Sequence, residues 1–207
     1  MVKSSYHDFL FDKEVYTSRI QVSAETFLIE ANSRGKIEGR DIYCHVVGLG
    51  LGVWQVSRVQ NKYFLRAWVR ALAASKFDHI KDIDFSWIAK SEEVTELQDK
   101  SKFGDTDITI HFSRRNPFDP LPGEDKSKLV VAMFAWDGNC YIGNEYWSGN
   151  LSASGDPAAA CCSNIPELLN PDVNMAVRGD NLHIASVQQG LVQYTQYRRG
   201  MEEEKTK

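Results

Sequence analysis

The feature that most constrains the fold is the stretch over residues 129–162, which reads LVVAMFAWDGNCYIGNEYWSGNLSASGDPAAACC. It opens with an apolar run, residues 129–135, that predicts a buried strand. Gly, Asn, Ser and aromatic residues follow, and a helix is expected to start at Asp156 and Pro157. A strand that leads into such a loop and then into a helix is typical of α/β proteins, which hold ligands there. We therefore expect the functional site in this stretch.

A second stretch has the same plan. Residues 41–47 predict a buried strand, and an apolar stripe over residues 59–72 predicts a helix. The loop between them contains Gly48, Gly50 and Gly52, but in a spacing that differs from the GxGxxG dinucleotide fingerprint. Backbone without Cβ atoms can approach a phosphate closely. The alternative is a tight strand-to-helix turn that requires a positive φ.

The rest of the chain continues the alternation of strands and helices. We expect a helix over residues 23–34 with Ser23 as its cap and Gly35 as its end, strands over 79–88 and 107–112, a charged connection with a helical turn or two over 90–107, a proline-rich loop over 113–127, a helix over 157–169, strands over 182–187 and 191–197, and a frayed tail from 198. This pattern predicts one α/β domain over residues 1–207, with its core at about 20–197 and helices on both faces of a mixed sheet.

Composition and charge exclude several classes of function. The net charge of −4 and the pI of about 5.8 argue against a nucleic-acid partner or a membrane-surface partner. Apolar runs fall short of the roughly 20 residues that span a bilayer, and Asp8, Asp12 and Glu14 interrupt any leader-like segment. The cysteines lack CxxC spacing and include the adjacent pair Cys161 and Cys162, which favours a reducing cytosolic or nuclear setting.

Three acids in or beside the central loop are the candidate catalytic residues. Asp137 stands where the predicted strand stops, which suits general acid–base work or binding of a ribose hydroxyl; the alternative is an Asp-Gly turn. For Glu145 the alternative is a solvent-facing loop acid, and for Asp156 it is a helix cap. The sequence has no GxSxG elbow, its five histidines show no metal-ligand spacing, and no cysteine stands in an activating setting. A hydrolase would therefore depend on carboxylates.

Aromatic side chains surround these acids. They are Trp136, Tyr141, Tyr146 and Trp147. They are suited to stacking on a base or a sugar, and equally to packing against the loop.

Together these residues suggest a family. The segment WDGNCYIGNEYWSGNLSASGDPAAACCSNIPELLNP, with VVGLGLGVW upstream, resembles the macrodomain-like family that is related to poly(ADP-ribose) glycohydrolases and includes the Legionella effector MavL. The resemblance extends over roughly residues 40–190. It implies a macrodomain-like three-layer α/β/α sandwich, ADP-ribose as ligand and removal of ADP-ribose from a modified protein. For the Legionella member the substrate is ADP-ribosylated ubiquitin arginine.

The resemblance also implies roles for individual residues. Asp137 and Asn139 match positions that hold the distal ribose, and Glu145 and Asp156 are further acids of the site. The second phosphate loop and the remaining ligand contacts are assigned to Gly48, Gly50, Gly52, Asn144, Tyr146, Trp147, Ser154 and Gly155. The order of the loops is reversed relative to ordinary macrodomains, as in a circular permutation. The vicinal glutamates of the glycohydrolases are absent from this glycine context, which favours release of a single ADP-ribose.

The resulting hypothesis is a carboxylate-dependent hydrolase that acts at C1″ of protein-linked ADP-ribose without a metal or a cofactor. Its partners are ADP-ribose and an ADP-ribosylated protein, with ubiquitin as one candidate. Two alternatives stay open at this point: an ADP-ribose reader without turnover, and an adaptor domain whose loops bind protein.

Overall fold

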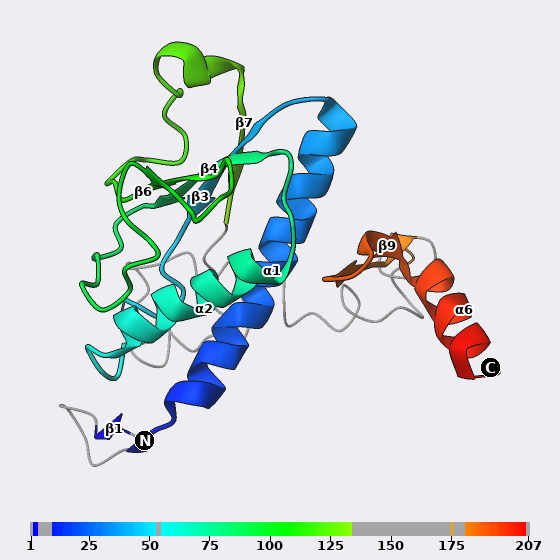
Figure 1. Cartoon of the computed structure of the whole chain (residues 1–207), viewed down its shortest axis with the longest axis horizontal. Coiled ribbons are helices and arrows are strands. Elements are labelled where there is room, and N and C mark those ends of the chain that lie inside the picture. Colours follow the sequence, from blue (N-terminus) through cyan, green and yellow to red (C-terminus); the bar gives the residue numbers. More distant parts are fainter. Residues whose placement is uncertain (1, 4–9, 53–54, 134–174, 176–180, 206–207) are drawn as a thin grey trace. The chain divides into compact units, whose positions relative to one another are not determined.

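The computed structural model describes residues 2–3, 10–52, 55–133, 175 and 181–205 (Figure 1). The chain divides into two compact units, one formed by Met1–Met133 and Ala185–Gly190 and the other by the remaining residues. The single domain expected over residues 1–207 stays a prediction. Of the helices in the described ranges, none is both long and apolar enough to cross a bilayer.

The first unit contains a mixed five-stranded sheet in the order β5-β6-β4-β3-β7. The strands are β3 (Ile42–Val46), β4 (Ile80–Phe85), β5 (Ser101–Lys102), β6 (Thr109–His111) and β7 (Leu129–Ala132), and a short pair, β1 (Val2–Lys3) and β2 (Leu10–Phe11), lies outside this sheet. The β3, β4, β6 and β7 strands are parallel to one another, whereas β5 runs antiparallel to β6. The expected α/β class and mixed sheet are confirmed, and the described elements are consistent with a three-layer fold.

The helix α1 (Lys13–Glu38) is far longer than the helix expected over residues 23–34. Asp12 caps it, because its Oδ1 accepts the N–H groups of Glu14 and Val15 at 3.0 and 3.1 Å. The predicted stop at Gly35 is wrong, since the helix ends at the C-cap Gly39. Gly35 serves close packing instead: a Cβ there would lie 2.6 Å from the Cβ of His79.

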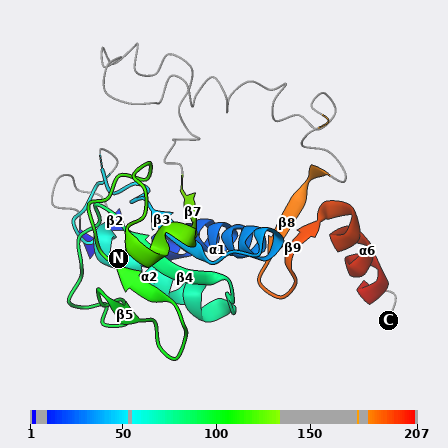
Figure 2. The ribbon, with the colours of Figure 1, turned by 90° about the horizontal axis from the view of Figure 1, so that it is seen from above.

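The helix α2 (Gln60–Ala74) confirms the expected apolar stripe. Its residues Phe64, Ala67 and Trp68 are fully buried, and the indole of Trp68 packs edge-on against Phe85 of β4 with ring centroids 5.5 Å apart. The helices α1 and α2 pack side by side (Figure 1 and Figure 2). The core of this unit therefore lies between these helices and the apolar face of the sheet.

Three other expectations are corrected. β7 is an edge strand of the described sheet, and only Val131 in it is buried. The apolar run over residues 129–135 is therefore not a fully buried strand. Residues 134–135 of this run lie outside the described ranges. The connection over 90–107 forms turns and β5 in place of helical turns, because Val94 and Leu97 anchor it in the core. The proline-rich loop ends in a 3-10 helix, η1 (Gly123–Ser127).

The last described segment is residues 181–205, of which Ala185–Gly190 belong to the first unit and the rest to the second. The two expected last strands are confirmed as β8 (His183–Ser186) and β9 (Gly190–Gln193), which form a two-stranded sheet. The expected strand over 191–197 stops early and the frayed tail is wrong, since α6 (Tyr194–Lys205) occupies this segment. An ion pair between Arg198 and Glu202, one helical turn apart at 3.1 Å, favours the helix.

Candidate functional site

The carboxyl ends of the parallel strands meet at one edge of the sheet. From β3 the chain passes through β4 to β6 on one side, and then crosses to the opposite side of β3 to form β7. The order of the strands therefore reverses between β3 and β7. In open α/β sheets, ligands bind at the carboxyl edge at such a topological switch point. The sheet thus indicates a site beside the end of β3.

The loop with Gly48, Gly50 and Gly52 follows β3 at this switch point. Gly50 has a φ of +74°, a conformation that residues with a Cβ rarely adopt, so the positive φ that the turn alternative requires is present here, and ligand binding by the loop stays a prediction. An added Cβ at Gly50 or Gly52 would meet nothing within 4 Å. Leu49 and Leu51 donate their N–H groups within the loop, to Val47 O and Gly48 O, whereas those of Gly50 and Gly52 have no partner in the described ranges. The loop therefore presents open, donor-bearing backbone at the edge.

The start of α2 adds to this backbone. The N-cap Val59 makes no side-chain cap bond, and the first turn contains no acidic residue. The side chain of Gln60 accepts the N–H groups of Val56 and Ser57 at 2.6 and 2.8 Å, which orders the segment between the loop and the helix. The positive end of the α2 dipole consequently has no carboxylate against it in the first turn.

The chain leaves β7 at the same edge, and the predicted acids come later in the sequence. Met133 donates its N–H to His45 O at 2.9 Å, so the chain leaves β7 directly beside the strand that leads to Gly48. The structure thus places this exit next to β3, the strand that leads into the three glycines. The other predicted site residues lie outside the described ranges: Asp137, Asn139, Asn144, Glu145, Tyr146, Trp147, Ser154, Gly155 and Asp156.

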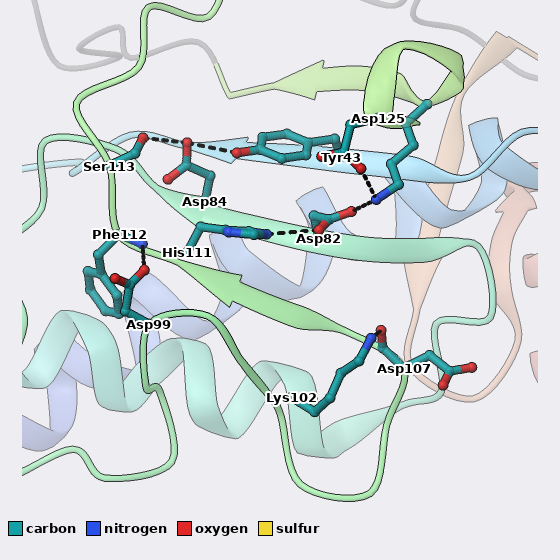
Figure 3. A network of polar contacts seen from close by, with 11 residues as sticks. Tyr43, Asp82, Asp84, Asp99, Lys102, Asp107, His111, Phe112, Ser113 and Asp125 are labelled. Carbon is teal, nitrogen blue, oxygen red and sulfur yellow. Dashed lines mark hydrogen bonds and ion pairs between the residues drawn. The ribbon is translucent and has the colours of Figure 1, made fainter. Parts of the chain in front are cut away.

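A buried polar group, here called the Asp84 cluster, occupies the sheet face on the carboxyl half of β3 and β4. It consists of Tyr43, Asp84 and Ser113, which Figure 3 shows, and of His45, which pairs with Asp84 in the register of β3 and β4. The carboxyl oxygen Oδ2 of Asp84 accepts the hydroxyls of Tyr43 at 3.1 Å and Ser113 at 2.7 Å. Asp84 is 0% exposed and its Oδ1 has no partner among the described residues; His45 is 1% exposed, and within the same ranges its Nδ1 has none either. Two buried polar atoms thus stay available in this cluster.

The same environment shifts two pKa values. Burial raises the pKa of the Tyr43 phenol above its ordinary value, and the nearby Asp84 carboxylate raises it further, so the phenol stays a hydrogen-bond donor. Burial lowers the pKa of His45; Asp84 opposes this and Arg115 adds to it. The His45 ring is accordingly neutral at physiological pH, with one nitrogen able to accept a hydrogen bond.

A second group, here called the Asp82 network, occupies the amino half of the same face. His111 Nε2 lies 2.8 Å from Asp82 Oδ1, and Lys128 bonds both Asp82 and Asp125 (Figure 3). Burial alone would raise the pKa of Asp82, but hydrogen bonds from His111 and Lys128 outweigh it and lower the pKa. Both carboxyl oxygens of Asp82 are thereby satisfied. Within the described ranges no three His, Cys, Asp or Glu side chains are grouped so as to hold a metal ion.

Sequence reasoning missed the Asp84 cluster. It predicted a strand over residues 79–88 without giving Asp82 and Asp84 a role. The available signal was two acids at alternate positions in the otherwise apolar run IKDIDF, because carboxyls in a central strand must find partners. Those partners come from neighbouring strands, so the register was needed to identify them.

Comparison with known proteins gives a consistent result. The family described as ADP-ribosylhydrolase MavL-like has a model that matches residues 2–200. The Drosophila melanogaster ADP-ribosylarginine hydrolase CG3568 is 41% identical over 198 residues, which cover 92% of this chain and 38% of that protein. The Drosophila melanogaster ADP-ribosylarginine hydrolase CG2909 is 33% identical over 199 residues, covering 91% of this chain and 39% of that protein.

These matches differ in extent. The chain spans about two-fifths of the length of these curated relatives. The family match, by contrast, includes the glycine loop, both carboxylate groups of β4 and the stretch after β7. On this ground the chain belongs to the MavL-like ADP-ribosylhydrolase family.

Proposed function

We propose that this chain hydrolyses the bond between ADP-ribose and an arginine side chain of a modified protein. The observation that supports it most is the switch point between β3 and β7, where the glycine loop and the exit toward Asp137 lie on adjacent parallel strands. Membership of an ADP-ribosylhydrolase family and likeness to two ADP-ribosylarginine hydrolases support the reaction class.

In this proposal the glycine loop binds the diphosphate. The open N–H groups of Gly50 and Gly52 point to a ligand rich in acceptors, and a diphosphate offers several. The uncapped start of α2 favours a negative ligand. Backbone donors that are already fixed in place need no reorganisation when charge develops during the reaction.

The chemistry is assigned to the acids after β7. The bond from C1″ of the ribose to the arginine nitrogen breaks through an oxocarbenium-like state, a water oxygen bonds to C1″, and the guanidine nitrogen takes up a proton. We assign Asp137 as the principal acid–base or positioning group, with Glu145 and Asp156 as the further acids and Asn139 sharing the ribose. The remaining contacts are proposed at Asn144, Tyr146, Trp147, Ser154 and Gly155. No cofactor is required, and ADP-ribose is the product.

The finer parts of the proposal concern fold and substrate. We propose a macrodomain-like arrangement with permuted loops. The substrate is an arginine-linked ADP-ribose on a protein, and ubiquitin is the first protein to test. A cytosolic or nuclear location would give access to such a substrate.

The deciding experiment combines calorimetry with single-turnover hydrolysis. ADP-ribose is titrated into the chain, and arginine-ADP-ribosylated protein is then mixed with excess chain while free ADP-ribose is quantified by chromatography. The proposal expects both binding and release. Binding without release would identify a reader module, and absence of both would identify an adaptor; either result rejects the hydrolase.

A further inference from the structure

An exposed aromatic residue stands at the carboxyl edge of the sheet, directly after β4. The side chain of Trp87 is 71% exposed, although large aromatic residues normally bury most of their surface. Its backbone has a φ of +61°, and among the described non-glycine residues only Lys100 shares a positive φ. This conformation is unfavourable for a bulky side chain. The Trp87 N–H donates to Ser113 O at 2.8 Å, which fixes the strained residue to the end of the neighbouring strand.

Arg114 completes a two-residue surface with Trp87. Its guanidinium lies 5.7 Å from the centroid of the indole ring, within the range of a cation–π contact. Arg114 is exposed, and the described ranges contain no carboxylate paired with it. The surface therefore offers an apolar ring and a positive charge that has no anionic partner among the described residues.

This surface lies beside the glycine loop. The next residue, Ile88, places its Cγ1 3.4 Å from where a Cβ of Gly48 would stand. Ser113, which binds the Trp87 N–H, also donates its hydroxyl to Asp84. Trp87 and Arg114 are thus tied to the elements that form the candidate site, at the same edge of the sheet.

We infer that Trp87 and Arg114 form a docking surface for the protein that carries the ADP-ribosylated arginine. Exposed Trp and Arg are the residue types that contribute most to protein–protein binding. A backbone conformation that costs stability while it holds a ring in solvent is explained by an external partner. Arg114 favours a partner with a carboxylate near the modified arginine. This inference rests on the proposed hydrolase function and adds recognition of the protein part of the substrate.

The test compares two substrates that contain the same bond between ADP-ribose and arginine. One is ubiquitin ADP-ribosylated on arginine, and the other is free ADP-ribosylarginine, which lacks a protein surface. For Trp87→Ala and Arg114→Glu, kcat/KM on the protein should fall about tenfold or more through KM, while kcat/KM on the small compound stays at the wild-type value. Ile37→Ala is the matched control, since Ile37 is an equally exposed apolar residue at the end of α1, which leads to the amino edge.

Each of the other outcomes contradicts a specific part of the inference or of the proposed function. Equal losses on both substrates would mean that the ring contacts the ADP-ribose itself, and no loss on either would remove Trp87 and Arg114 from recognition. Wild-type chain that hydrolyses neither substrate would reject the proposed function as well. Trp87→Gly separates docking from folding: it relieves the positive φ, so its Tm should equal or exceed that of Trp87→Ala, yet it should show the same loss on the protein substrate.

Discussion

Asp82 and Asp84 stand two residues apart on the same face of β4, and their surroundings differ. Asp82 is held by His111 and Lys128 on separate oxygens, and its pKa is lowered accordingly. From the part of the chain that the structure describes, Asp84 receives two hydroxyl groups, both on Oδ2, and no partner for its buried Oδ1. The amino half of the face is therefore a closed structural network, whereas the carboxyl half retains unused polar atoms.

The difference follows the direction of the strands. Lys128 immediately precedes β7, so the cation of the Asp82 network comes from the amino edge. The Asp84 cluster adjoins the ends of β3 and β4, where the glycine loop begins. Stability is thus concentrated at one edge and candidate function at the other, and substitutions at the two edges should differ accordingly.

The largest effect is expected at Asp82. Asp82→Ala removes the shared partner of His111 and Lys128 and leaves a partly buried ammonium with one carboxylate, so the free energy of unfolding should fall by about 3–5 kcal/mol. Urea denaturation measures it. Asp125→Ala is the control, because it removes only the more exposed partner of Lys128 and should cost about 1 kcal/mol or less. Equal, small losses in both variants would show that the network is not structural.

The second-largest effect is expected at Asp137, on the rate of ADP-ribose release. Asp137→Ala should lower single-turnover release of ADP-ribose about 10²-fold, the usual range for a lost acid–base or positioning group, with little change in Tm. Asp137→Asn should be nearly as slow while it binds ADP-ribose better than the Ala variant, since it keeps the shape. Glu38→Gln, an exposed acid at the end of α1, serves as the control. A wild-type rate in Asp137→Asn would move the chemistry to Glu145 or Asp156.

The glycine loop should show an effect on affinity. Gly50→Val adds a branched side chain to the open backbone, which should weaken ADP-ribose binding by about 2 kcal/mol through lost phosphate contacts. The variant also strains a positive φ, so Gly104→Val is the matched control: Gly104 has a φ of +52° and equally open space. Calorimetry that finds the same affinity in both folded variants would exclude this loop from the site.

Much of the first unit was predictable from periodicity. The apolar stripe of α2 and the strands β3, β4 and β6 follow directly from the spacing of buried side chains. Gly35 was misinterpreted because a glycine that ends a helix and one that permits close packing look alike in sequence. The α6 helix was missed because the polar tail was expected to fray, yet pairs such as Arg198 and Glu202 support a helix without burial.

The difference between the surroundings of Asp82 and those of Asp84 could not be predicted from the sequence. The partners of Asp82 lie 29 and 46 residues away along the chain, and only the parallel register brings them to it. The glycine loop could be predicted from the sequence because three glycines in five residues are distinctive. The acids after β7 stay predictions, since residues 134–174 lie outside the described ranges.

A further test uses pH. Because the folded pKa of Asp82 lies below the unfolded value of about 3.9, its network stabilises the protein fully above that value. The contribution is lost as pH falls through the lower, folded pKa. The wild type should therefore lose Tm on acidification more steeply than Asp82→Asn, which has no carboxylate to protonate. Parallel Tm curves for the two proteins between neutral and acidic pH would contradict the role given to this network.

The smallest effect is expected at Asp84, and it gives the sharpest contrast with Asp82. Asp84→Asn keeps an oxygen that accepts the hydroxyls of Tyr43 and Ser113, and it breaks no ion pair among the described residues. It also replaces a buried carboxyl, one oxygen of which has no partner in the described ranges, with a neutral amide. The free energy of unfolding should therefore change by no more than about 1 kcal/mol, in either direction. Asp82→Asn, the matched substitution two residues away, should be clearly more destabilising because His111 and Lys128 lose their carboxylate. Urea denaturation of the two variants side by side measures the difference. A loss at Asp84 as large as the loss at Asp82 would show that the carboxyl half of the face is as structural as the amino half.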